Sequence, residues 1–121
     1  MALDNKRKTI EFLSAKGISF EGKYFSFASR QTNDNTFWNN ARKAEISREW
    51  YLVLNNQITK EVFVLRFPPN EFQTSLETIP GKLKLRRDKP YYLDLNIDAD
   101  SFVDRASRLD FTRYIIHRFK Y

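Results

Sequence analysis

The sequence predicts a single α+β domain over residues 1–121, in which a mostly antiparallel sheet carries three helices packed on one face. The apolar runs EWYLVL and EVFVLRF, joined by NNQITK, are typical of two adjacent central strands. Alternating residues in two other segments indicate two further hairpins, which brings the sheet to about six strands. Helix signals near the start, the middle and the end of the chain complete this fold class.

The first element is expected to be a helix over residues 4–16. Asp4 or Asn5 can cap its start, and Gly17 suits the position just after its end. The segment ISFEGKYFSFA then predicts a hairpin that turns at its Glu-Gly-Lys sequence. The chain therefore begins with one helix and two short strands.

Residues 29–45 interrupt this pattern, because Asn, Thr, Gln and Asp dominate the segment. It is expected to form a long loop with a short helix near its end. Loops of this length in compact domains are often functional. Two alternatives stay open for Phe37 and Trp38: they anchor the loop in the core, or they are presented to a ligand.

After the two central strands, the sequence predicts a short middle helix. Pro68-Pro69 ends the second strand, and Asn70 can cap a helix that runs through Phe72 and Leu76. Pro80-Gly81 then predicts a turn.

KLKLRRDKPYYLDLNID predicts the third hairpin, with a five-residue connection over 86–90. This register places Leu85 opposite Tyr91. On the other face it places Lys82 opposite Asp94, and Lys84 opposite Tyr92.

The chain is expected to close with a long helix over residues 101–119, started by Asp100 or Ser101. Apolar residues approximate one stripe along it. They are Phe102, Ala106, Leu109, Ile116 and Phe119. No internal repeat is expected.

Composition limits the classes of function. Apolar residues make up 41% of the chain and aromatic residues 16%, which is enough to build a core. The absence of cysteine excludes disulfides, thiolate zinc sites and a cysteine nucleophile. No apolar run approaches the roughly 20 residues of a membrane span, and the charged N-terminus does not resemble a signal peptide. We expect a soluble, cytoplasmic protein without a membrane partner or a cofactor.

The segment LDLNIDADSF, residues 93–102, resembles the signature helix of LAGLIDADG homing endonucleases and also opens like a calcium loop. The endonuclease helix needs glycines for close packing, but Asp94 stands where the first would be, and none follows Asp100. A calcium loop needs glycine and glutamate where this chain has Ala99 and Arg105. The segment therefore predicts a strand that leads into a helix, and no metal site.

No complete catalytic set is present in the sequence. Glu21-Gly22-Lys23 is similar to the acid-x-lysine element of PD-(D/E)xK nucleases, but its glycine favours a turn over a core strand. The single histidine, His117, has no G-x-S-x-G serine to accompany it. We expect no catalytic residues.

The leading prediction is a small, basic, non-enzymatic module that binds nucleic acid. The net charge is +6, and the basic residues gather in three clusters: residues 6–8, residues 82–89 and residues 105–120. Amides and aromatic rings in the 29–45 loop can pair with or stack on bases. The residues expected to contact nucleic acid are Arg30, Trp38, Asn39, Arg42, Lys43, Arg105, Arg108, Arg113, His117 and Lys120.

Two other classes of function remain as alternatives. In a metal-independent, toxin-like ribonuclease, the reacting phosphate would be stabilised by Arg113, His117, Lys120 and Tyr121. In a protein-interaction or inhibitor module of phage or mobile-element origin, the loop and Trp38 would meet a protein partner, which could be acidic. The sequence leaves the oligomeric state open.

Overall fold

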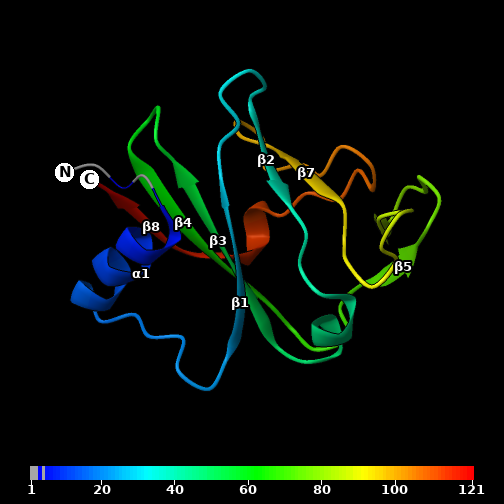
Figure 1. Cartoon of the computed structure of the whole chain (residues 1–121), viewed down its shortest axis with the longest axis horizontal. Helices are drawn as coiled ribbons and strands as arrows, with labels where there is room; N and C mark the ends of the chain where they lie inside the picture. The colour runs from blue at the N-terminus through cyan, green and yellow to red at the C-terminus, as the bar shows by residue number, and fades with distance from the viewer. Residues whose placement is uncertain (1–2, 4) are drawn as a thin grey trace.

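A four-stranded sheet lies at the centre of the computed structural model, which describes residues 3 and 5–121. Its strands follow the order β1 (Tyr24–Ser29), β3 (Trp50–Asn56), β4 (Glu61–Phe67) and β8 (Ile115–Lys120). β3 pairs in parallel with β1 and antiparallel with β4, and β8 is antiparallel to β4 (Figure 1). β1 and β8 are therefore the two edges of the sheet.

The two faces of this sheet are covered differently. The helix α1 (Lys6–Ala15) packs on one face, where Leu13 meets Val53 and Val64 in a buried cluster. The other face carries a larger cluster, which joins the sheet to two small ribbons and the turns around them. One ribbon is β2 (Thr36–Asn39) with β7 (Leu95–Asp98), and the other is β5 (Gln73–Ser75) with β6 (Lys82–Lys84). Two 3-10 turns, η1 (Lys43–Ser47) and η2 (Thr112–Tyr114), complete the described elements.

The predicted fold class is wrong in its helices and in its sheet. Across residues 3 and 5–121, α1 is the single α-helix, and the strands form mixed sheets rather than three antiparallel hairpins. No helix within this described part is long and apolar enough to cross a membrane.

The first helix agrees with its prediction because its signals are local. The Asn5 side chain accepts a hydrogen bond from the Lys8 amide, as an N-cap should. At the other end, Gly17 has φ +84, and the amides of Gly17 and Ile18 donate to the carbonyls of Ser14 and Leu13. This is a Schellman ending, which favours glycine at that position. The alternative cap, Asp4, lies outside the described residues.

The central pair β3–β4 also agrees with its prediction. Leu52 lies opposite Leu65 and Val53 opposite Val64, so that successive pairs face opposite sides of the sheet. Both strands are buried almost throughout. An apolar run without alternation suits this environment, because both faces of the strand are covered.

The two segments before β3 differ from their predictions. Residues 18–20 form no strand, and the Glu-Gly-Lys turn leads into β1, which pairs with β3 instead of a hairpin partner. Residues 29–45 are no simple loop, since they contain β2 and the start of η1. Phe37 is fully buried whereas Trp38 is 47% exposed, as the alternation of a strand requires.

The prediction of a middle helix is also wrong, because Asn70 has φ +57 and the strand β5 forms where the helix was expected. The third predicted hairpin is shifted by two residues, with Leu85 opposite Leu93 in an isolated bridge, and Tyr91, predicted to lie opposite Leu85, is 61% exposed. Lys84, and not Lys82, therefore reaches Asp94, at 3.6 Å. A shift of two residues preserves the alternation of the two faces, so the apolar pattern alone could not detect it.

The predicted long C-terminal helix does not form. Two six-residue turns take its place, and η2 and β8 follow them. The turns are residues 98–103, DADSFV, and residues 104–109, DRASRL. In each, the first amide donates to the sixth carbonyl and the fifth amide donates to the first carbonyl. The fifth residues, Phe102 and Arg108, have φ of +60 and +63. The segment thus contains a short structural repeat, which the sequence does not predict.

Aspartate side chains hold these turns, which we call the first (98–103) and second (104–109) Asp turns, in place of a helix. Asp98 accepts hydrogen bonds from the amide and hydroxyl of Ser101, and Asp104 accepts the same pair from Ser107. Such local bonds offer the backbone an alternative to helix formation. β8 then begins with Ile115 and Ile116, whose β-branched side chains favour a strand.

Candidate nucleic-acid interface

The structure does not assemble the ten residues predicted to contact nucleic acid into one surface. With no helix over 101–119, the basic stripe expected there does not form. The ten residues are divided between the 30–43 segment, the second Asp turn, η2 and β8.

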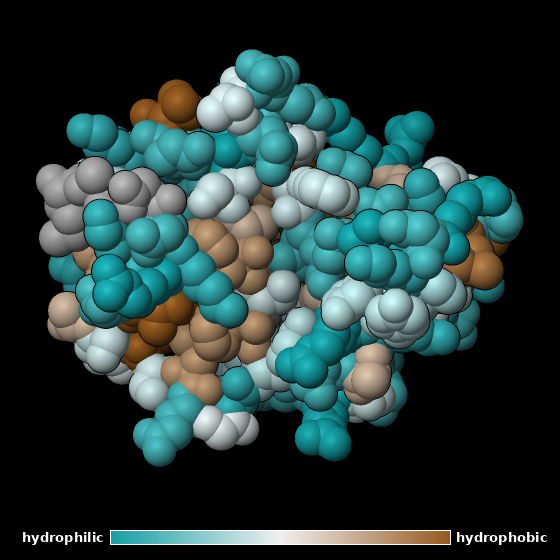
Figure 2. All heavy atoms as spheres, viewed as in Figure 1, coloured by the Kyte–Doolittle hydropathy of each residue, from teal (hydrophilic) through white to brown (hydrophobic). Residues whose placement is uncertain are grey.

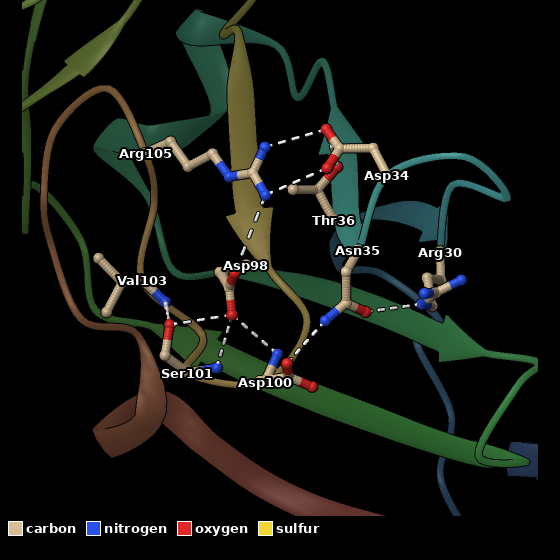
Figure 3. A network of polar contacts seen from close by, with 9 residues as sticks. All are labelled: Arg30, Asp34, Asn35, Thr36, Asp98, Asp100, Ser101, Val103 and Arg105. Atoms are coloured by element: carbon tan, nitrogen blue, oxygen red, sulfur yellow. Dashed lines mark hydrogen bonds and ion pairs between the residues drawn. The ribbon is translucent and has the colours of Figure 1, made fainter.

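Arg30 and Arg105 belong to a polar network that joins residues 30–36 to both Asp turns (Figure 3). Arg105 forms a forked pair with the Asp34 carboxylate, at 2.9 and 3.2 Å. Asn35 accepts from Arg30 Nε at 2.7 Å and donates to Asp100 Oδ2 at 2.7 Å. Both guanidinium groups therefore have partners within the protein, and their contacts are structural.

Trp38 and Asn39 also have internal partners. The exposed Trp38 indole donates through Nε1 to Asp94 Oδ1 at 3.0 Å. Asn39 is buried, donates to Ser26 and to the Phe27 carbonyl, and accepts from the Ala41 amide. Asn39 thus ties β2 to β1 and offers no amide to a base.

The proposed ribonuclease residues do not converge. Arg113 is engaged by the Tyr114 hydroxyl, at 2.6 Å, and by Glu71, at 3.8 Å. In β8, His117 lies opposite Val64 and Lys120 opposite Glu61, so their side chains point to opposite faces of the sheet. The Tyr121 hydroxyl donates to the buried Asn55.

Ion pairs also reduce the charge of the basic clusters at 82–89 and 105–120. Besides Lys84 with Asp94, the pairs are Arg86 with Asp88, Arg87 with Glu77, and Arg118 with Glu61. The Asp88 carboxylate has a lowered pKa, chiefly because Arg86 donates hydrogen bonds to it. These cations are partly balanced before any ligand arrives.

Arg42 lines a different site, a groove of about 570 Å³ along the open edge of β1. We call it the β1 groove. Its cations are Lys6, Lys23 and Arg42, and its rings include Tyr24, Phe25 and Tyr92. In Figure 2, which views this side of the molecule, apolar side chains are visible between hydrophilic ones over the middle of the surface.

The fold brings these cations together from three separate parts of the chain. Lys6 is the first residue of α1, Lys23 ends the turn before β1, and Arg42 precedes η1. Backbone contacts fix the position of Arg42. Its amide donates to the Tyr24 hydroxyl at 3.0 Å, and its backbone forms an isolated β-bridge with Tyr92.

Each of the three cations lies over an aromatic ring. Lys6 is 5.0 Å from the Phe25 ring centre, and Arg42 is 4.9 Å from that of Tyr24. Lys23 is 5.1 Å from the ring of Tyr51, just outside the groove. A cation held by a ring keeps its full positive charge, unlike one paired with a carboxylate.

The β1 groove is electrostatically one-sided. None of the described residues that line it is acidic, although the chain has 15 Asp and Glu residues. None of Lys6, Lys23 and Arg42 has an ion-pair partner among residues 3 and 5–121. The groove is therefore suited to anions.

Sequence reasoning found Arg42 but missed Lys6, Lys23, Tyr24 and Tyr92 as members of one site. The available signal was the adjacency of lysine and aromatic residues in KYF, residues 23–25, and in KPYY, residues 89–92. Only the fold shows that these two segments meet.

Neither a metal site nor a relative identifies the function. Over the described residues, no group of three or more His, Asp and Glu side chains could hold a metal ion. Comparison of the chain with protein-family models, with curated proteins and with solved structures finds no match. The function is therefore inferred from the residues of the groove themselves.

Proposed function

We propose that this protein binds nucleic acid in the β1 groove. The observation that carries the proposal is the combination of three cations and several aromatic rings, without a carboxylate, in one open groove. Lysine and arginine contribute most of the affinity of proteins for phosphate backbones, and they do so without reading sequence. Aromatic rings beside them can stack on bases.

The distribution of ion pairs favours this groove over the rest of the surface. Arg105 and Arg113 would have to leave Asp34 and Glu71 before they could contact a phosphate. The cations of the groove would exchange only water and an aromatic face. Binding at the groove is therefore less opposed by competing contacts than binding at the Asp turns or at η2.

The proposal is tested by the affinity for a fluorescent oligonucleotide over a range of salt concentrations. Each phosphate contact contributes a slope of about 0.7 for single strands and about 0.9 for duplex DNA in log affinity against log salt. The triple variant Lys6→Gln, Lys23→Gln, Arg42→Gln is expected to bind more weakly. Its slope should be smaller by about 2 to 3, the sum of three lost contacts.

A second triple variant, Lys60→Gln, Arg108→Gln, Lys120→Gln, removes the same charge from outside the groove and serves as the control. These three side chains are exposed and lie in the β3–β4 turn, the second Asp turn and β8. The control should keep most of the wild-type slope. Equal slopes for the two variants, or no binding by the wild type at low salt, would overturn the proposal.

A further inference from the structure

A second groove lies beside the β1 groove, on the other side of a narrow ridge. It measures about 610 Å³ and is lined by Lys43, Ile46, Phe72 and Tyr91, among others. None of the described residues that line it is acidic. Its exposed lining is mainly apolar, in contrast to that of the β1 groove.

The ridge between the two grooves is built from two paired dipeptides, Arg42-Lys43 and Tyr91-Tyr92. Arg42 bridges to Tyr92, and the Lys43 amide donates to the Tyr91 carbonyl at 2.9 Å. Arg42 and Tyr92 line the β1 groove. Lys43 and Tyr91 face the second groove. Each side of the ridge thus presents one cation and one tyrosine.

Tyr91 is the most exposed ring described at this ridge. Its side chain is 61% exposed, and its ring centre lies 5.0 Å from that of Tyr92. A large ring that remains so exposed contributes little to the core, and the backbone carbonyl of Tyr91 accepts the hydrogen bond from the Lys43 amide. The Tyr91 ring is therefore an exposed surface on which a base can stack.

We infer that the ligand is a single-stranded nucleic acid that crosses this ridge and occupies both grooves. The inference rests on the proposed function and specifies its ligand. Bases stack on Tyr91 and Tyr92, and the connecting phosphates pass Lys43 and Arg42. The apolar second groove, with Phe72 and Ile46, takes a base rather than a phosphate.

The tyrosines are what select a single strand. In a duplex the base faces are stacked on one another, so they cannot reach rings that stand on a ridge. A duplex could contact only the cations. Single strands gain roughly 1–3 kcal/mol for each base stacked on an aromatic side chain, largely without regard to sequence.

The test compares three single variants, Tyr91→Leu, Tyr91→Phe and Trp38→Leu, for binding to an unstructured oligothymidine and to a duplex of the same length. Tyr91→Leu is expected to weaken single-strand binding by roughly 5- to 150-fold, which corresponds to the loss of one stacked base. Tyr91→Phe keeps the ring and should bind as the wild type does. Trp38 is an exposed ring outside both grooves, so Trp38→Leu should change the affinity by less than about twofold.

The outcomes separate this inference from the proposal on which it rests. Equal wild-type affinities for single strand and duplex, or equal affinities of Tyr91→Leu and wild type for the oligothymidine, would overturn the inference and leave polyanion binding intact. Absence of binding to either nucleic acid would overturn both. Loss of single-strand affinity in Tyr91→Leu with unchanged duplex affinity would support both.

Discussion

Glu61 and Arg118 form an ion pair whose two partners depend on each other unequally. Arg118 donates to Glu61 Oε2 at 2.7 Å through Nε. The Glu61 side chain is 11% exposed, whereas that of Arg118 is 65% exposed. Loss of the arginine leaves a shielded carboxylate without its main partner, but loss of the carboxylate leaves an arginine that water can still solvate.

We therefore expect Arg118→Gln to lower the free energy of unfolding by about 1–3 kcal/mol, and Glu61→Gln by less than about 1 kcal/mol. Urea denaturation of the two variants at neutral pH measures the difference. A larger loss in Glu61→Gln would contradict this assignment of the buried partner.

The same pair predicts a dependence of stability on pH. Burial by itself would raise the pKa of Glu61, but hydrogen bonds from Arg118 and Thr59 outweigh burial and lower this pKa. A carboxylate with a lowered pKa in the folded state stabilises the protein above its unfolded pKa and loses this effect as pH falls through the folded pKa. The destabilisation by Arg118→Gln should thus shrink as the medium is acidified below about pH 4.

Among the elements, the two Asp turns are the least familiar, because their stability comes from side chains that bond to their own backbone. Asp104 is fully buried, and its carboxylate accepts from the amides of Asn96 and Ser107. Asp110 begins the next stretch of chain, is exposed, and accepts from the amide and hydroxyl of Thr112. The two aspartates have similar local bonds but different burial.

Burial should decide how much each aspartate contributes. Asp104→Ala leaves two amides without their acceptor in the interior, so we expect a loss of about 2–4 kcal/mol in the free energy of unfolding. Asp110→Ala leaves the Thr112 amide exposed to water, which can replace the lost acceptor. We expect it to lower the free energy of unfolding by about 1 kcal/mol or less. Thermal or urea unfolding of the pair provides the measurement, and equal losses would show that burial is not the cause.

For the molecule as a whole, the distribution of burial predicts where opening requires the most energy. β3 and β4 are covered on both faces and have a neighbouring strand on each side. The segment 98–113 is held by turns and isolated bridges. Amide hydrogen exchange should therefore be slowest in β3 and β4 and several orders of magnitude faster in the exposed parts of the Asp turns. Equal protection of both regions would contradict this picture.

The success of sequence reasoning followed the range of the interactions involved. Asn5, Gly17 and the apolar runs of β3 and β4 act on their own segments, and these elements were predicted correctly. The prediction of a helix over the 98–110 region was wrong for a physical reason. Asp and Ser at its turns are the same residues that cap helices, and a sequence does not show which backbone amides they will meet.

The candidate site divides in the same way. The sequence alone determined the excess of positive charge, the lack of cysteine and the closeness of lysine to aromatic residues in short segments. The tertiary structure decided which cations stay unpaired, because Asp34 and Glu71 are distant in sequence from the arginines they meet. It also brought Lys6, Lys23 and Arg42 to one edge of the sheet. Charge is a property of composition, but its availability depends on which carboxylates the fold places beside it.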